Sequence, residues 1–319
     1  MKNKILISII VNCFNGERFL VEALESVINQ TYQNWELIFW DNQSVDNSSE
    51  IIKSYKHPNF NYFYSPKHTN LGKARELALK NTKGDWIGFL DCDDIWLPEK
   101  LQNQVSVINS FEGNLGLIYS KCEFFRYRLN INKKVIRESS VKPCNDLPTF
   151  KVSKELFIGN FIPFPSVLYK REAIIKAGKF SNYKFSPDYF LNLSVSLNYD
   201  IFAIEKVLCC YRYHDSNLSI STKEIGLLEN IEIIKKLVPK NNYETLSRSH
   251  KIRYLIFLLS NFKIQSTYIF IKKENLLNLF LGFIDICLYI KRFNFRYNLG
   301  FNVNLKIKWQ SKKIFKRMK

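Results

Sequence analysis

Alternation of buried strands with amphipathic helices over the first 125 residues limits the fold most strongly. The apolar run Ile5–Val11 reads as a strand buried on both faces, and apolar residues at helical spacing follow it from Phe19 to Ile28. The same patterns predict strands at 35–40, 60–64, 85–90 and 115–120, helices at 46–55 and 72–80, and a helix whose first turn holds Pro98. Such alternation predicts the α/β class, with a doubly wound, mostly parallel, Rossmann-like sheet and right-handed crossovers.

The pattern changes beyond this sheet. Residues 126–160 are polar and irregular, which predicts a loop or hairpin over the site. A helix is expected around 188–197, a strand around 199–213, and helices from about 222 onward. We therefore expect an α/β domain over residues 1–220 and a basic helical C-terminal extension over 221–319.

Positive charge gathers at the C-terminal end of the chain. The formal net charge is +18, and residues 251–319 carry 15 Lys and Arg against two acidic residues, a net of +13. The apolar run 276–290 is shorter than the roughly 20 residues that span a bilayer. With its basic flanks and the tail 306–319, it predicts peripheral contact with an anionic membrane. The alternative is a helix packed on the α/β domain, with a solvated basic face. No nucleic-acid-binding module is recognisable, so we expect no nucleic-acid partner.

Cysteine usage and the N-terminal run both favour the cytoplasm. The seven cysteines are scattered and form no Cys-x-x-Cys motif, which indicates neither a disulfide framework nor a zinc site. The apolar run after Met1 is short and no small-residue cleavage site follows, so we interpret it as a strand and not as a signal peptide. We expect a cytoplasmic protein at the inner face of the cell membrane.

Polar side chains follow three of the predicted strands. They are Asn12 to Asn15, then Asp41 and Asn42, then Asp91, Asp93 and Asp94. Ligands bind outside the carboxyl ends of the strands in open α/β sheets, so these groups are expected to share one edge. The three carboxylates favour a hard cation, Mg²⁺ or Mn²⁺, bound with a diphosphate; an acid/base pair and a solvated turn are the alternatives. The chain lacks the glycine-rich motifs of dinucleotide-binding and P-loop sites.

Several motifs resemble, in the same order, those of family 2 glycosyltransferases with the GT-A fold, of the bacterial surface-polysaccharide type. Residues 8–48 resemble the opening unit with its Y-N and D-D-G-S-x-D elements, and "TNLGKARELAL" (69–79) resembles the N-x-G-K-A segment. "FLDCDDIW" (89–96) carries the D-x-D motif. Segments 165–180, 186–195 and "YRYH" (211–214) resemble the second half more loosely, so that the resemblance covers about residues 5–220.

This resemblance implies a role for each matching residue. Contacts with the nucleotide-sugar are implied for Asn12, Phe14, Asn15, Asp41, Lys73 and Asp91. Asp93 and His214 would bind a divalent cation, and Asp188 would be the base that deprotonates the acceptor hydroxyl. Lys73 or Arg75 would stabilise the leaving diphosphate.

The implied reaction is inverting, metal-dependent transfer from a nucleotide-sugar, most simply UDP-linked. The implied acceptor is a saccharide, or a polyprenyl-linked saccharide, in the synthesis of capsule, O-antigen or exopolysaccharide.

The chain departs from the family pattern at three positions. Asn42 and Gln43 replace Asp and Gly, so either this turn needs no positive φ or the base pocket is reshaped. Pro187 replaces the first carboxylate of the E-D motif, and Asp200 or Asp215 is the base if that alignment slips.

Other interpretations of the remaining residues and of the function stay open. Asp94 either joins the site or caps the following helix, His214 could be structural, and Lys73 and Arg75 could be solvated helix residues. The alternative functions are a nucleotidyltransferase and a degenerate, non-catalytic GT-A domain that binds membrane or partner enzymes.

Overall fold

The computed structural model describes residues 4–129, 135–141, 149, 152–178, 180–218, 222–238, 243–260 and 264–274. Contacts divide the chain into two compact units, one ending at Tyr254 and the other beginning at Leu255. The predicted domain boundary after residue 220 stays a prediction. The apolar run 276–290 and the basic tail 306–319 lie outside the described residues. Within the described ranges, no helix has both the length and the apolar character needed to cross a membrane.

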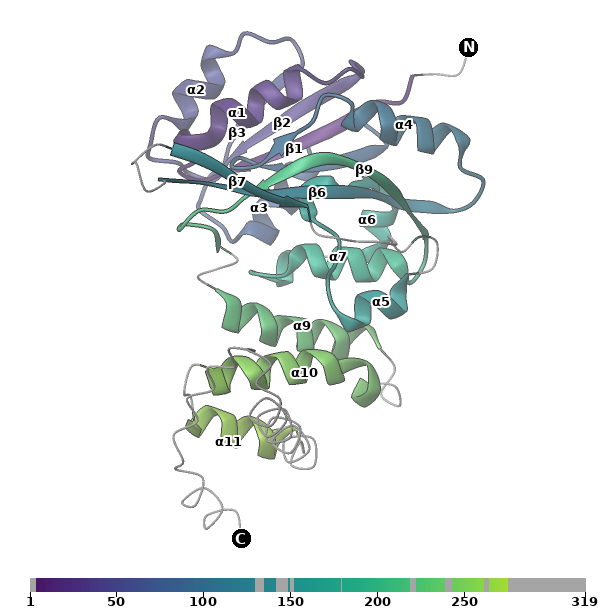
Figure 1. Ribbon diagram of the computed structural model, residues 1–319. Helices are drawn as coiled ribbons and strands as arrows, with labels where there is room; N and C mark the ends of the chain where they lie inside the picture. Colours follow the sequence, from purple (N-terminus) through teal and green to yellow (C-terminus); the bar gives the residue numbers. More distant parts are fainter. Residues whose placement is uncertain are drawn as a thin grey trace. The chain divides into compact units, whose positions relative to one another are not determined.

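A nine-stranded sheet forms the centre of the first unit (Figure 1). The strands are β1 (Ile7–Cys13), β2 (Trp35–Asp41), β3 (Phe60–Tyr64), β4 (Trp86–Asp91), β5 (Ile95–Trp96), β6 (Leu115–Leu129), β7 (Val135–Val141), β8 (Leu168–Lys170) and β9 (Asp200–Arg212). Their order is β3-β2-β1-β4-β8-β6-β9-β5, with β7 paired to β6. Strands β1 to β4 and the β6–β9 pair are parallel to their neighbours, whereas β8, β5 and β7 pair antiparallel. The expected mostly parallel, doubly wound α/β sheet is confirmed.

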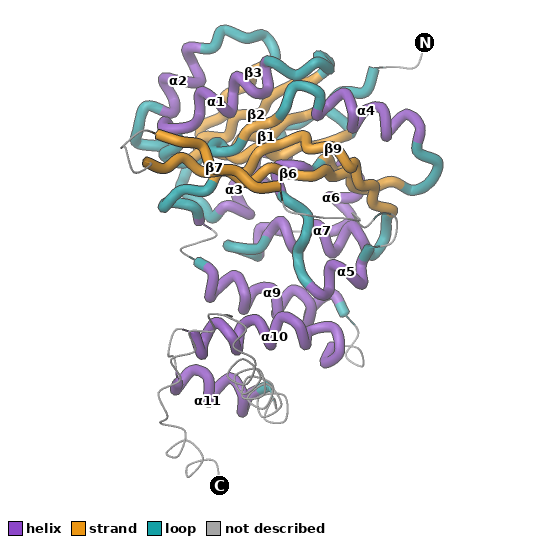
Figure 2. The backbone as a smooth tube through the Cα atoms, viewed as in Figure 1, coloured by secondary structure: helices purple, strands orange, loops and turns teal. Residues whose placement is uncertain are grey.

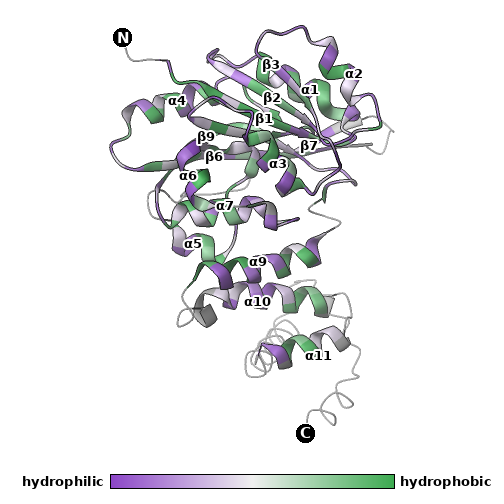
Figure 3. Ribbon diagram, turned by 180° about the vertical axis from the view of Figure 1, so that it is seen from behind, coloured by the Kyte–Doolittle hydropathy of each residue, from purple (hydrophilic) through white to green (hydrophobic). Residues whose placement is uncertain are grey.

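Helices lie on both sides of this sheet, as the tube in Figure 2 shows. Those that contact its strands are α1 (Glu17–Ile28), α2 (Ser48–Ser54), α3 (Leu71–Leu79), α4 (Lys100–Ser110), α6 (Arg171–Ala177) and α7 (Pro187–Ser196). Helices α5 (Ser153–Ile158) and α9 (Lys223–Leu237) also belong to the first unit, α10 (Tyr243–Ser260) crosses the boundary after Tyr254, and α11 (Ile264–Lys273) belongs to the second unit. Short 3-10 turns lie at Phe164–Ser166 and Phe180–Asn182. In Figure 3 hydrophilic and hydrophobic residues alternate along α1 and α4, as expected for amphipathic helices between a core and water.

Strand β1 shows how the sequence builds two cores. Successive side chains of a strand point to opposite faces of a sheet. Ile9 and Val11 therefore pack in one cluster with Leu24 of α1, whereas Ile10 packs in the other with Ala78 of α3. Burial on both faces explains the continuous apolar run, and it leaves the polar residues after β1 at the edge of the sheet.

The structure decides three of the expectations about local structure, two at the start of α4 and one at the end of β6. Pro98 lies ahead of α4, which begins at Lys100 after the N-cap Glu99, so its placement in the first helical turn was wrong. Asp94 is likewise not the cap of that helix. The irregular region from 126 begins as a hairpin, because β6 continues to Leu129 and pairs with β7; residues 130–134 and 142–148 lie outside the described ranges.

Candidate active site

The carboxyl ends of β1, β2 and β4 bring three of the predicted site residues side by side. Asn12 is in register with Trp40 of β2 and with Asp91 of β4, and Cys13 is in register with Asp41. Parallel pairing of β1 with β2 and β4 therefore brings the carboxyl ends of these strands together, as the sequence predicted. Asn12, Asp41 and Asp91 share one edge although they are far apart in the sequence.

Asn12 presents polar atoms without partners at this edge. Its side chain is buried, and neither its Oδ1 nor its Nδ2 has a hydrogen-bond partner among the described residues. Leaving a buried donor or acceptor unsatisfied costs about 1–3 kcal/mol. The amide is therefore available to a polar ligand.

Phe14 and His68 form an aromatic pair beside Asn12. Phe14 is 50% exposed, and its ring centre lies 4.3 Å from that of His68. Sequence reasoning missed His68, whose Nδ1 lies 2.9 Å from the Asn42 carbonyl oxygen. Exposed rings of this kind offer a surface on which a planar group can stack.

Asn15 holds two loops together. It adopts a φ of 55°, its Oδ1 accepts a hydrogen bond from the Val45 amide at 2.9 Å, and its own amide donates to Ser44 Oγ at 3.1 Å. This side chain has a structural task, and its contact with a nucleotide stays a prediction.

Asp41 is completely buried. Its Oδ1 accepts a hydrogen bond from the Ser44 amide at 2.7 Å, and its Oδ2 accepts one from the Tyr62 hydroxyl at 2.9 Å. These bonds shape the turn after β2. The predicted contact between Asp41 and the base stays a prediction.

Asn42 and Gln43 show what the departures from the family pattern do. The Asn42 amide donates to the Thr69 carbonyl at 2.7 Å and accepts from the Thr69 amide at 3.2 Å, which fixes the loop before α3. Gln43 has a φ of 70°, so the expectation that this turn needs no positive φ was wrong. A side chain in this left-handed region costs roughly 1–2 kcal/mol relative to glycine.

Arg75 and Asp91 form a pair at the end of β4. Arg75 Nη2 lies 2.6 Å from Asp91 Oδ1, and the guanidinium carbon lies 3.9 Å from the centre of the Phe164 ring. Arg75 is only 3% exposed, so a solvated helix residue is the wrong description. Lys73 is more exposed and pairs with Glu76 at 3.2 Å.

Asp93 and His214, the two predicted metal ligands, are in contact. Asp93 Oδ2 lies 2.9 Å from His214 Nε2, although the residues are 121 positions apart. Ser216 Oγ lies 2.8 Å from the other ring nitrogen, and Asn217 Nδ2 lies 3.2 Å from Nε2. In the part of the chain that the structure describes, no group of three or more His, Cys, Asp or Glu side chains is arranged to hold a metal. Two adjacent ligands fit Mg²⁺ or Mn²⁺, which commonly take their other ligands from substrate phosphates and water.

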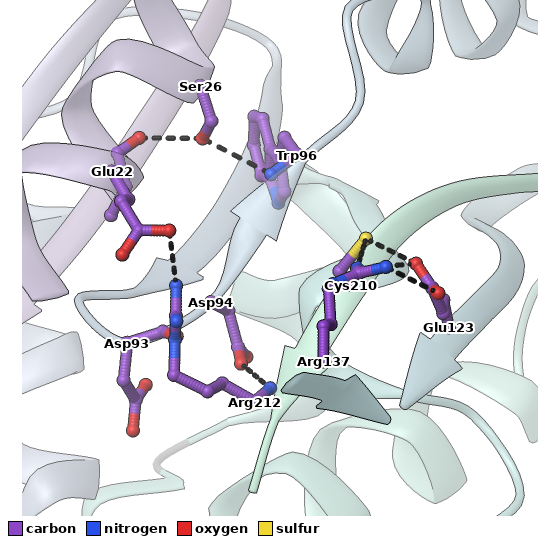
Figure 4. A network of polar contacts seen from close by, with 10 residues as sticks. Glu22, Ser26, Asp93, Asp94, Trp96, Glu123, Arg137, Cys210 and Arg212 are labelled. Atoms are coloured by element: carbon purple, nitrogen blue, oxygen red, sulfur yellow. Dashed lines mark hydrogen bonds and ion pairs between the residues drawn. The ribbon is translucent and has the colours of Figure 1, made fainter. Parts of the chain in front are cut away.

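Arg212 fixes the acidic turn through three hydrogen-bonding groups, and its side chain extends beside Asp93 and Asp94 toward Glu22 (Figure 4). Its Nε donates to the Asp93 carbonyl at 2.8 Å, its backbone amide donates to Asp94 Oδ1 at 2.9 Å, and its Nη2 lies 2.9 Å from Glu22. Burial, together with the charges of Asp93 and Asp91, raises the pKa of the Asp94 carboxyl well above its usual range. Arg212 belongs to the segment YRYH (211–214), but sequence reasoning missed its role.

Asp188 lies in the first turn of α7 at the head of a chain of polar groups. Its Oδ2 accepts a hydrogen bond from Asn160 Nδ2 at 3.0 Å; Asn160 Oδ1 accepts from Asn192 Nδ2 at 3.1 Å, and Asn192 Oδ1 accepts from the Tyr169 hydroxyl at 2.5 Å. Burial raises the pKa of Asp188, and the nearby Arg75 guanidinium opposes that rise. A carboxylate with a raised pKa suits a general base.

The other two candidates for the base have different surroundings. Asp200 begins β9, at the edge of the sheet opposite to the acidic turn, and accepts a hydrogen bond from the Asn114 amide at 3.1 Å. Asp215 follows His214 and lines a hollow of about 330 Å³. The complete lining of this hollow is Arg18, Phe19, Arg126, Tyr127, Arg212, Tyr213, His214 and Asp215.

Curated proteins similar to this chain are glycosyltransferases. One relative is the Escherichia coli UDP-Glc:alpha-D-GlcNAc-diphosphoundecaprenol beta-1,3-glucosyltransferase WfgD, 28% identical over 229 residues that cover 70% of this chain and 83% of that protein. An uncharacterized glycosyltransferase of Haemophilus influenzae is 33% identical over 184 residues, which cover 57% of this chain and 68% of the relative.

Two solved structures share the fold. Staphylococcus aureus TarS 1–349 in complex with UDP-GlcNAc superposes with a TM-score of 0.57 at 18% identity, over 80% of this chain and 72% of that chain. The mannosyltransferase PcManGT from Pyrobaculum calidifontis, in complex with GDP-Man and Mn²⁺, superposes with a TM-score of 0.58 at 14% identity, over 89% of this chain and 80% of that chain. The predicted GT-A fold is confirmed. Residues 8–174 match the family described as glycosyl transferase family 2, and the chain belongs to that family of glycosyltransferases.

Proposed function

We propose that this glycosyltransferase moves a sugar from a nucleotide-sugar, most simply a UDP-sugar, to a saccharide carried on a polyprenyl diphosphate. The observation that carries the proposal is the contact between Asp93 and His214, 2.9 Å apart, at the same sheet edge as Asp91. The name of WfgD specifies a UDP-glucose donor and a diphosphoundecaprenol acceptor, which supports both halves of the proposal. The product would enter a cell-surface polysaccharide such as capsule, O-antigen or exopolysaccharide.

The nucleotide would lie across β1 and β2. Its base would stack against Phe14 and His68, whose ring centres are 4.3 Å apart, and Asn12 would supply its unpartnered amide. Asn15 and Asp41 would shape this pocket through their hydrogen bonds to residues 44 and 45. Lys73, with its exposed ammonium, would contact the diphosphate.

A divalent cation, Mn²⁺ or Mg²⁺, would be held by Asp93 and His214. When bound, it would neutralise charge that develops on the leaving diphosphate. Arg212 holds the Asp93 backbone through its Nε, which keeps this ligand oriented. Asp91, paired with Arg75, would face the ribose and the diphosphate.

Asp188 would act as the base of a single displacement. The acceptor hydroxyl attacks the anomeric carbon, Asp188 takes the hydroxyl proton, and the bond from that carbon to the diphosphate oxygen breaks. Attack on the face opposite to the leaving group inverts the anomeric configuration. Asn160 Nδ2 donates a hydrogen bond to Asp188 Oδ2 and so orients the carboxylate. The base therefore does not have to be ordered during the reaction.

The C-terminal basic region would hold the enzyme against the membrane. Residues 251–319 carry a net charge of +13, and each basic residue near an anionic surface contributes about 1 kcal/mol. The enzyme would then lie at the cytoplasmic face of the membrane, beside a lipid-linked acceptor.

A panel of UDP- and GDP-sugars, incubated with the full chain and Mn²⁺, tests the proposal. The wild type should release nucleoside diphosphate from one donor, whereas Asp93→Ala and Asp188→Asn should lower the rate at least a hundredfold. Asp85→Asn is the matched control, because this exposed carboxylate precedes β4 at the opposite edge of the sheet. Release of pyrophosphate would favour a nucleotidyltransferase, and no binding of any nucleotide would refute the proposal.

A further inference from the structure

The hollow beside His214 is built from a different part of the fold than the predicted nucleotide pocket. Its lining comes from the start of α1, the β6–β7 hairpin, and the end of β9 with the residues that follow it. The nucleotide pocket uses β1, β2 and the loop before α3. The two regions meet at the contact between Asp93 and His214.

Two of the three arginines in this hollow are placed to bind an anion. Arg18 has no ion-pair partner among the described residues, and its guanidinium carbon lies 4.8 Å from the centre of the Phe19 ring. Arg212 is 1% exposed, and its Nη1 has no hydrogen-bond partner within the described ranges. Its guanidinium lies between the rings of Phe19 and Phe125, at 4.5 and 4.7 Å.

Other arginine groups of the hollow have acidic partners, and one acidic residue joins the lining. Arg126 pairs with Glu138 at 3.0 Å, Arg212 Nη2 pairs with Glu22, and Asp215 is the acidic member of the lining. The unpaired guanidinium of Arg18 is therefore the exposed donor that a ligand would use, and the unpartnered Nη1 of Arg212 is a second donor that is buried in the lining.

The hollow also carries two exposed aromatic rings. Tyr127 and Tyr213 are 49% and 40% exposed, and both line the hollow. A guanidinium group matches the geometry of phosphate oxygens and binds them with two parallel hydrogen bonds. Tyrosine rings supply a flat apolar face together with a hydroxyl group, which fits the face of a sugar ring. The combination indicates a sugar that is linked to phosphate.

We propose that this hollow binds the sugar diphosphate end of the acceptor, with Arg18 and Arg212 on the diphosphate and the tyrosines on the sugar. The inference rests on the proposed transfer to a polyprenyl-linked saccharide and assigns a recognition site to that acceptor. The donor diphosphate is the other source of the same chemistry. The acceptor is favoured because His214 is the one residue that the lining shares with the predicted donor site, and the rest comes from other strands and helices.

Two soluble probes test the assignment in the full chain: an α-GlcNAc diphosphate on a short alkyl chain, and the matched alkyl α-GlcNAc without the diphosphate. Arg18→Ala should weaken binding of the diphosphate probe about tenfold, because hydrogen bonds to charged groups are the strong ones. Arg248→Ala, which removes an exposed arginine on α10, is the matched control and should change nothing. Dissociation constants are measured without donor, and acceptor and donor KM values are measured during turnover.

Each outcome decides between the possible sources of the phosphate. Loss of affinity for the diphosphate probe alone, with the donor KM unchanged, supports the proposal. An equal loss with both probes, or a rise of the donor KM in place of the acceptor KM, overturns it. If the diphosphate probe binds and Arg18→Ala weakens that binding, but no sugar is transferred, then the hollow is a diphosphate site and the proposed transfer reaction is what fails.

Discussion

At the scale of single residues, Asp188 depends on amides that lead into the core. Asn160 contacts its carboxylate, and Asn192, which is buried, fixes Asn160 in turn. The Tyr169 hydroxyl completes the series. The Tyr169 hydroxyl donates to Asn192 Oδ1, which leaves the Nδ2 of Asn192 to donate to Asn160 Oδ1. The Nδ2 of Asn160 is then turned toward the Asp188 carboxylate, to which it donates. Asn160 is therefore a positioning residue for the proposed base.

Replacing Asn160 with alanine should lower kcat about tenfold and leave the donor KM nearly unchanged. The amide donates to the charged form of Asp188, so its removal raises further a pKa that burial already raises. The base works when it is ionised. Activity is therefore lost as the pH falls through this pKa, and the acidic limb of the kcat/KM profile should move to higher pH in Asn160→Ala.

The matched control for this experiment is Asn198→Ala, which removes an amide that donates to the Ser194 carbonyl at the end of α7. The control should keep the wild-type pH profile. If Asn160→Ala lowers kcat without moving the acidic limb, Asn160 supports the fold and does not position the base.

The sequence predicted the acidic turn and His214, because short motifs carry them. It did not predict their partners. Arg212 contacts Asp93 across 119 positions, and His68 lies against Phe14 from a loop after another strand. Arginine, histidine and asparagine are ordinary surface residues in a sequence, and their roles here are set by neighbours that only the folded chain supplies.

At the scale of elements, α10 is joined to α5 and α7 by one buried histidine. His250 Nε2 lies 3.1 Å from the Phe157 carbonyl oxygen and 3.0 Å from the Tyr189 hydroxyl. Ser249 Oγ donates to the Ile158 carbonyl beside it at 3.0 Å. Burial, with a smaller contribution from Arg253, lowers the pKa of His250 to about 4.

This histidine should make the stability of the first unit, which ends at Tyr254, depend on pH. An unfolded histidine has a pKa of about 6.5, so between pH 6.5 and 4 the unfolded chain binds the proton more readily. The free energy of unfolding should then be at its full value above pH 6.5 and fall by about 3 kcal/mol as the pH approaches 4. Urea unfolding at half-unit pH steps measures this slope.

A substitution at residue 250 should remove that dependence. His250→Gln does not titrate, so its unfolding free energy should be lower at pH 7 and flatter between pH 6.5 and 4. His57→Gln, at a partly exposed histidine before β3, should keep the wild-type slope. Equal slopes for the wild type and His250→Gln would mean that other groups cause the acid sensitivity.

Elements with a clear period were predicted within a few residues, and irregular ones were not. The expected strand at 35–40 is Trp35–Asp41, and the expected strand at 60–64 matches β3. The strand predicted at 115–120 extends to Leu129, and the loop or hairpin expected from residue 126 begins as a hairpin with β7. The length of β6 was missed because its second half mixes polar and aromatic residues. Whether and how far such a segment forms a strand depends on its pairing partner, which the periodicity of its own sequence does not reveal.

At the scale of the whole molecule, the chain divides its charge unevenly. Residues 251–319 carry a net of +13, and the remaining 250 residues carry +5 out of the total of +18. The proposed chemistry needs acidic groups at the sheet edge, whereas all but two of the charged residues of the C-terminal region are basic. Catalysis and attachment to a surface would thus be separate tasks of separate parts of the sequence.

The basic tail should bind the full chain to anionic vesicles in a salt-dependent manner. We expect co-sedimentation with vesicles containing 30% phosphatidylserine at low ionic strength, and release at about 0.5 M NaCl, where the Debye length falls below about 5 Å. Lys312, Lys313, Lys316 and Arg317 are close together in the tail. Replacing all four with glutamine should weaken binding by at least a hundredfold, because each charge contributes about 1 kcal/mol near the surface.

A variant with the same change in net charge separates the tail from the total charge. Lys56, Lys80, Lys83 and Lys154 are exposed residues of the first unit, and their replacement with glutamine should leave vesicle binding within about threefold of the wild type. Both variants should turn over a soluble acceptor at the wild-type rate, since neither touches the proposed site. Only the tail variant should be slow with an acceptor embedded in vesicles. If both variants lose vesicle binding equally, net charge and not the tail attracts the protein, and the C-terminal region has another task.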